Sequence, residues 1–151
     1  MKRNLFSSAL LLLVFVLLSA CSKKDQEPGN RIAIGTEIYY PHTVSRDDSL
    51  RGLTASAAKD SSHVTVYLLF HSLPTANGTF KIINTTNPKP DEVCVTPFGS
   101  SLGSYTSDSN QGSITVNVSD SKISALVPPI WVKNINNPQD SLQFSASLTE
   151  Q

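Results

Sequence analysis

Cysteine, histidine, tryptophan and methionine are scarce in this chain of 151 residues, which contains two, three, one and one of them. So few cysteine and histidine residues leave no His/Cys cluster at the spacing that zinc sites use. The chain also lacks a nucleophile elbow, a Walker loop, an HExxH motif, a CxxC motif and a dinucleotide fingerprint. We therefore expect no metal, no cofactor and no catalytic residue, and a small hydrolase is the least favoured function.

Basic runs are absent as well. The sequence has twelve basic and twelve acidic residues, a formal net charge of 0, and no cluster of lysine and arginine. Proteins that bind nucleic acid carry a basic patch or stripe that neutralises phosphates. We expect no nucleic-acid partner.

Long hydrophobic runs are limited to one, residues 9–18 near the start of the chain. About ten apolar residues are half of what a membrane-spanning helix needs. Lys2 and Arg3 precede the run, and the small residues Ser19 and Ala20 follow it before Cys21. A positive start, a short apolar centre and small residues before the cleavage point are typical of a signal peptide.

The four residues Leu18-Ser19-Ala20-Cys21 resemble the lipobox of a type II signal peptide, which marks bacterial lipoproteins. The resemblance implies that residues 1–20 are removed and that Cys21 becomes an acylated first residue. Two or three acyl chains anchor far better than one. The membrane is then the partner at Cys21. Ser22 in place of an aspartate favours the outer membrane, on either its periplasmic or its surface side.

Residues 21–30 are polar, include proline and glycine, and offer nothing to bury, so they predict a flexible tether. Without Lys2 and Arg3, ten basic residues stand against twelve acidic ones, and the mature chain carries a formal charge of −2. The remaining 121 residues, 31–151, suit one domain.

Apolar residues in this domain recur with a period of two. The stretch from His63 to His71 places Val64, Val66, Leu68 and Phe70 on one face, with His63, Thr65, Tyr67 and His71 on the other. Similar alternation recurs in Ile32/Ile34/Ile38, Phe80/Ile82, Ile114/Val116/Val118, Ile123/Ala125/Val127 and Leu142/Phe144/Ala146/Leu148. This pattern predicts an all-β fold, a single antiparallel β-sandwich, with a small β-barrel as the alternative.

Short polar turns at residues 59–62 and 119–121 predict two hairpins, 53–58 with 64–70 and 114–118 with 123–127. A helix after Asp47 is a weaker alternative, which Gly52 disfavours. From about Leu53 to the end, the two hairpins, the Gly78-Thr79-Phe80 strand start, a strand at Tyr105 and the amphipathic final strand resemble small all-β lipoprotein domains of unknown function. That resemblance implies a fold and a location but assigns no site.

Three aromatic residues are the candidates for ligand binding. Trp131 alternates with Ile130 and Val132, so its indole faces outward if those two face the core. Packing is the favoured alternative, because tryptophan is usually largely buried and Pro128-Pro129 can shift the alternation. Tyr39 and Tyr40 form the second aromatic position. Cys94, lying between two valines, is instead expected to be a small buried residue.

His63 and His71 are eight residues apart on one expected strand, or roughly 26 Å, and cannot share a metal ion. The favoured function is a cell-envelope binding or accessory module for a glycan or protein partner. The alternative is a structural or assembly subunit that offers a sheet edge to its partner.

Overall fold

The alternating sequence forms strands throughout residues 29–151, the part of the chain that the computed structural model describes. Cys21, the expected signal peptide and nearly all of the expected tether lie outside these residues. The eleven strands are β1 (Arg31–Ile34), β2 (Glu37–Tyr39), β3 (Thr43–Asp47), β4 (Gly52–Lys59), β5 (Ser62–Phe70), β6 (Gly78–Ile83), β7 (Glu92–Gly99), β8 (Gly103–Ser107), β9 (Ser113–Ser119), β10 (Lys122–Asn134) and β11 (Ser141–Thr149).

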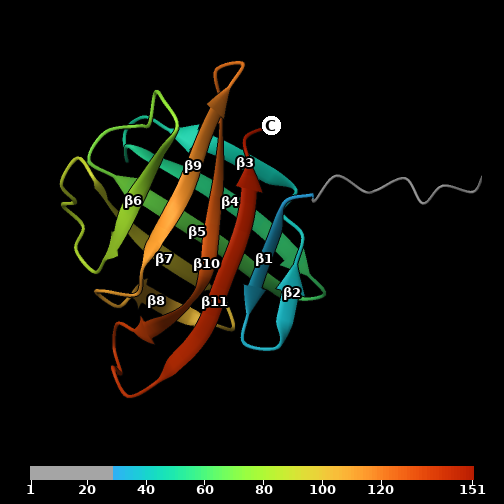
Figure 1. The fold of residues 1–151 in the computed structure, drawn as a ribbon. Helices are drawn as coiled ribbons and strands as arrows, with labels where there is room; N and C mark the ends of the chain where they lie inside the picture. Colours follow the sequence, from blue (N-terminus) through green and yellow to red (C-terminus); the bar gives the residue numbers. More distant parts are fainter. Residues whose placement is uncertain (1–28) are drawn as a thin grey trace, which may run out of the picture.

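The all-β prediction is confirmed. Within residues 29–151 there is no helix, and hence none of the length and apolarity needed to cross a membrane. One hydrogen-bonded path runs in the order β2-β1-β11-β10-β9-β6-β7-β5-β4-β3, with β8 attached to both β7 and β10. Figure 1 shows this path folding into two layers, the first from β2 to β6 and the second from β7 to β3.

Three links join the layers. The β6–β7 pair carries the sheet from one layer to the other, with Ile82 opposite Val93. At another point β8 pairs with β10 through Val132 and Ser107. At the far side, the backbone N–H of Gln151 donates to the carbonyl of Val44 on β3 over 3.0 Å. The two edge strands of the path, β2 and β3, have only three and five residues, and the end of the chain at Gln151 covers part of β3.

The core lies between the layers and consists of the inward-facing positions of each strand. On β5, Val64, Val66, Leu68 and Phe70 are all buried, as the alternation predicts. The rings of Phe70 on β5 and Phe80 on β6 meet edge to face, with centroids 5.1 Å apart. This contact joins the two layers, and edge-to-face pairs add to the stabilisation that burial alone provides.

Both predicted hairpins form. In the first, Leu53 lies opposite Leu68 and Ala58 opposite His63. In the second, Asp120 and Ser121 have φ angles of 51° and 62°, as a two-residue type I′ turn requires. That turn matches the right-handed twist of β9 and β10, and so it fixes their register.

The helix after Asp47, which Gly52 disfavours, does not form. The segment is a turn, in which the Asp47 carboxylate accepts hydrogen bonds from Ser49 and the backbone of Leu50. The Asp47 side chain thereby competes with a helical start. Ile38 does not continue the strand of Ile32, because a turn at Gly35 (φ 58°) starts β2, where Ile38 pairs with Ala33 and is exposed. The sheet is also not wholly antiparallel, since β6 and β7 are parallel.

Cys94 is buried, as predicted, but its surroundings are polar. Its Sγ atom lies 3.5 Å from the hydroxyl of Thr106 and 3.7 Å from that of Thr96. Nearby, the buried hydroxyl of Ser107 donates to the carbonyl of Ile83 and accepts from the backbone N–H of Val95. The thiol thus fills space beside a hydroxyl cluster that ties β8 to β7 and β6.

Adjacent positions on β11 test the inward and outward alternation. Phe144 is fully buried, whereas Ser145 lies on the outer face. Phe144→Ala should lower the free energy of unfolding by about 3 to 5 kcal/mol, because it opens a large cavity. Ser145→Ala should change it by less than about 0.5 kcal/mol, as outer-face substitutions usually do. Urea unfolding followed by circular dichroism measures both, and equal losses would contradict this orientation of β11.

Candidate functional site

The outer face of the first layer carries a groove of about 400 Å³ over β1, β11 and β10. Its origin is an irregularity in β10. The register against β11 shifts between Val127 and Ile130, where β10 contains Pro128 and Pro129. Proline has no N–H to donate to a strand ladder and is tolerated at such bulges. The bulge therefore interrupts the regular surface of the sheet at this point.

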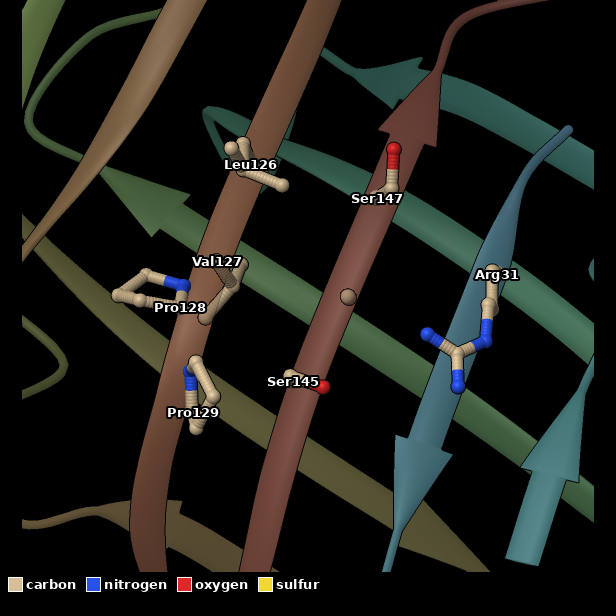
Figure 2. A pocket seen from close by; sticks show the side chains of 8 residues that line it. Arg31, Leu126, Val127, Pro128, Pro129, Ser145 and Ser147 are labelled. Carbon is tan, nitrogen blue, oxygen red and sulfur yellow. The ribbon is translucent and has the colours of Figure 1, made fainter. Parts of the chain in front are cut away.

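The groove has a polar floor between two unlike walls, as Figure 2 shows. Ser145 and Ser147 of β11 form the floor, where small side chains leave the sheet surface low. Leu126 and the two prolines of β10 form the apolar wall. On the opposite side, the Arg31 side chain extends from β1 toward β11. A shallow, partly apolar hollow with a few convergent polar groups is the usual form of a ligand site.

Trp131 continues the apolar wall, two residues beyond Pro129. It lies opposite Gln143 of β11, and 51% of its surface is exposed, while Ile130 and Val132 are buried. Its backbone N–H donates to the side-chain Oε1 of Gln111 over 3.0 Å, which holds the bulged segment to the loop between β8 and β9. The predicted outward orientation of Trp131 is thus found.

The other aromatic candidates do not lie beside Trp131. Tyr39 pairs with buried Ile32 and packs against the core, whereas Tyr40 is 69% exposed beyond the end of β2. Three strand spacings and three residues separate Tyr39 from Trp131, roughly 17 Å between their backbones. The structure therefore does not unite the three aromatic residues in one site.

A second hollow, of about 230 Å³, lies on the outer face of the second layer. It is lined by Leu50, Gly52, Tyr67, Leu68, Leu69, Thr86 and Thr96. The ring of Tyr67 stacks on Phe98 with centroids 5.3 Å apart. No charged side chain is among these lining residues, so the groove over β11, which has both Arg31 and hydroxyls, is the better candidate site.

Asp108 and Tyr105, whose pKa values are shifted, have structural partners outside the groove. A hydrogen bond from Lys133 lowers the pKa of Asp108, and the two groups form an ion pair at 2.8 Å. Asp140 accepts a 2.6 Å hydrogen bond from the hydroxyl of Tyr105, which raises the pKa of Tyr105. These pairs fasten β8 and the chain before β11 to the end of β10.

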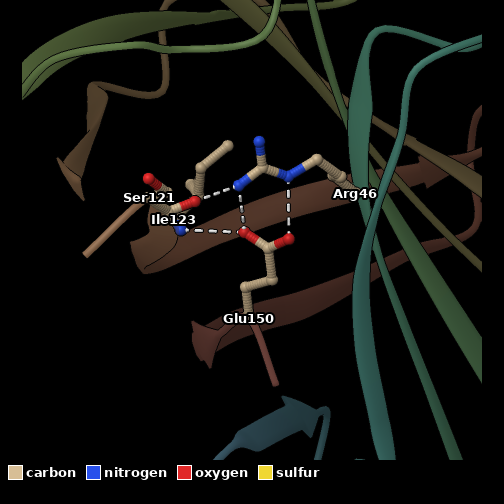
Figure 3. Close-up of polar contacts among 4 residues, drawn as sticks. All are labelled: Arg46, Ser121, Ile123 and Glu150. Carbon is tan, nitrogen blue, oxygen red and sulfur yellow. Dashed lines mark hydrogen bonds and ion pairs between the residues drawn. The ribbon is translucent and has the colours of Figure 1, made fainter. Parts of the chain in front are cut away.

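The Arg46–Glu150 pair joins the two layers, as Figure 3 shows. Nε and Nη2 of Arg46 on β3 each donate to one oxygen of Glu150 over 2.7 Å. Glu150 also accepts from the backbone N–H of Ile123, and Arg46 donates to the carbonyl of Ser121. The hydrogen bonds from Arg46 lower the pKa of Glu150. A bidentate ion pair of this kind fixes the relative orientation of the two side chains as well as pairing their charges.

No group of three or more metal-ligating side chains occurs within residues 29–151. His63 and His71 are both exposed, on the outer side of β5 and just after it. His71 Nδ1 lies 3.1 Å from the carbonyl of Pro88, and the carbonyl of His71 accepts from Arg51. These contacts fasten the loop that precedes β7.

Sequence reasoning missed four contributors to the groove: Arg31, Leu126, Ser145 and Ser147. Each stands at an outward position of its strand, which the alternation marks only as polar or exposed. The one local signal was Pro128-Pro129 within an otherwise alternating strand, because prolines there indicate a bulge. The order of β1, β11 and β10 was needed to bring these residues together.

Comparison with known proteins gives no relative: no family model matches this chain, no curated protein does, and no solved structure does.

The Arg46–Glu150 pair predicts a specific dependence of stability on pH. Because the folded-state pKa of Glu150 is lowered, its contribution is present above the ordinary value for an unfolded glutamate, about 4.3, and is lost as the pH falls through the folded-state value. Glu150→Gln should therefore destabilise the protein near neutral pH, and its difference from wild type should shrink in acid. Urea unfolding across this range measures the difference.

Asp60→Asn is the matched control, since Asp60 is an exposed turn residue with a positive φ that asparagine tolerates. It should change stability little at any pH. A Glu150→Gln difference that is independent of pH would contradict the role given to this ion pair.

Proposed function

We propose that the protein is a lipid-anchored module of the bacterial cell envelope that binds its target through the groove on the outer face of β1, β11 and β10. The groove, with Trp131 at its end, is the observation that carries the binding function. The lipobox-like residues Leu18-Ser19-Ala20-Cys21 support the anchor. The favoured location is the outer membrane, with either a glycan or a protein as partner.

Exposed apolar groups support recognition at this face. Leu126, which lines the groove, is 57% exposed, and Trp131, the next outward position of β10 beyond Pro129, is 51% exposed. Single exposed apolar residues are ordinary, but an aromatic residue beside a hollow with polar groups is characteristic of binding surfaces. The opposite side of the same strand forms the core, so the groove lies on a rigid support.

The tether and the fold suit this arrangement. The domain's first strand begins at Arg31, ten residues after Cys21. Ten residues span at most about 36 Å when fully extended. An acylated Cys21 would therefore keep the groove, which begins at Arg31, close to the membrane surface while leaving the domain free to turn.

The alternative, an assembly subunit that offers a sheet edge, has less support. The edge strands β2 and β3 have only three and five residues, and the chain end covers part of β3. Short or covered edges resist the addition of a further strand. The hollowed face of the sheet is a better recognition surface than either edge.

Cys21→Ser tests the anchor. The variant should take up no palmitate analogue during growth, because a serine oxygen cannot replace the sulfur in the acylated thioether. Cys94→Ser is the matched control and should be labelled as the wild type is, since Cys94 is buried in the folded domain. Metabolic labelling followed by gel fluorescence measures this. Equal label in Cys21→Ser and the wild type would refute the lipoprotein proposal.

A further inference from the structure

We infer that the groove over β11 takes an acidic saccharide, whose carboxylate pairs with Arg31 and whose rings lie along Leu126, Pro129 and Trp131. This inference rests on the proposed binding function and specifies its ligand class. Three features of the groove carry it: its place on a sheet face, its single charge, and its flat apolar wall.

The position of the groove excludes recognition by strand addition. Its floor strand, β11, is hydrogen-bonded on one side to β1, where Ser145 pairs with Ala33, and on the other to β10. β11 is thus an interior strand with a neighbour on each side, so it offers no free edge to which an extended peptide could pair. Recognition here depends on side chains, which are hydroxyls, one guanidinium and apolar groups.

Arg31 sets the charge of the ligand. No carboxylate is among the eight lining residues, and no hydrogen bond or ion pair joins the guanidinium of Arg31 to another residue in the range 29–151. The other two arginines in that range are engaged: Arg46 binds Glu150, and Arg51 donates to the carbonyl of His71. An arginine fork facing a groove without carboxylates matches a carboxylate in the ligand.

The apolar wall opposite Arg31 sets the shape of the ligand. Leu126, Pro129 and Trp131 are exposed along one face of β10, and the floor runs beside them from Ser147 to Gln143. At about 3.3 Å per residue this row is roughly 13 Å long, enough for more than one sugar ring. Sugar rings present C–H faces that lie against prolines and indoles, and hydroxyls that bond to serine and glutamine. One ligand class therefore satisfies both walls and the floor.

Trp131 is the only tryptophan in the chain, so intrinsic fluorescence reports on the surface beside the groove. The full chain in detergent is titrated with oligosaccharides of galacturonic acid, glucuronic acid and N-acetylneuraminic acid, each beside a neutral oligosaccharide of equal length. At least one acidic oligosaccharide should shift the Trp131 emission to shorter wavelength and saturate. The affinity for its neutral counterpart should be lower by about tenfold or more, because the neutral sugar lacks the charge-assisted hydrogen bonds.

Arg31→Gln should lower the affinity for that acidic oligosaccharide about tenfold or more and leave the weak neutral binding unchanged. Lys81→Gln is the matched control, because Lys81 is an exposed outer-face residue on β6 of the same layer, with β9 between it and β10. It removes the same charge and should change the affinity less than about twofold. Added salt should weaken acidic binding in the wild type but not in Arg31→Gln.

The inference is overturned if none of the three acidic oligosaccharides shifts the emission, if neutral counterparts bind equally well, or if Lys81→Gln loses as much affinity as Arg31→Gln. These outcomes differ from failure of the proposed function. Palmitate labelling at Cys21 together with retention on envelope material would leave the anchored module standing and remove only the acidic saccharide as its ligand.

Discussion

Exclusion of water from one face of the sheet is the constraint on which this structure depends. Most strands present apolar side chains on alternate positions, and a sheet with one apolar face is stable only if that face is covered. No helix is present within residues 29–151 to cover it, so the sheet covers itself. The fold into two layers, the parallel β6–β7 crossing and the contact of Phe70 with Phe80 follow from this requirement.

Folding a sheet over itself leaves two seams that need fastening. At one, β8 pairs with both β7 and β10. At the other, Gln151 bonds to β3, and the bidentate Arg46–Glu150 pair joins β3 to the end of β11 and to the β9–β10 turn. Because Glu150 is held by both Arg46 and the backbone of Ile123, it fixes the position of β3 relative to β10 and also stabilises the fold. The seam thus depends on side-chain chemistry where backbone pairing ends.

The fold class, the two hairpins and the faces of Phe144 and Trp131 were predictable from the sequence, because a period of two assigns every second residue to the core. The turn at Asp47 was less so, since a carboxylate that accepts two local hydrogen bonds overrides a weak helical pattern. The change of face at Ile38 required knowledge of the turn at Gly35. The parallel β6–β7 pair could not be predicted, because pairing between strands distant in sequence leaves no local pattern.

The candidate site shows the same limit. Trp131 was predictable as an outward residue, but Arg31, Ser145 and Leu126 acquire meaning only through the order β1-β11-β10. Arg31 and Ser147 are 116 positions apart in the sequence yet lie opposite each other in register. The proline bulge of β10 interrupts the pairing with β11 between Val127 and Ile130, and the side chains of these two residues remain in the core. In the proposed function, recognition belongs to the outer face of these three strands and stability to their inner face.

The central claim is that the outer face of β10 and β11 binds envelope material. Quenching of Trp131 fluorescence by iodide, with and without the lipid-extracted envelope of the cells that make the protein, tests it most directly. Trp131 is half exposed, so the free protein should be quenched readily. Bound to the envelope, it should be shielded. If the protein sediments with the envelope while Trp131 is quenched as before, binding occurs at another surface and the claim is contradicted.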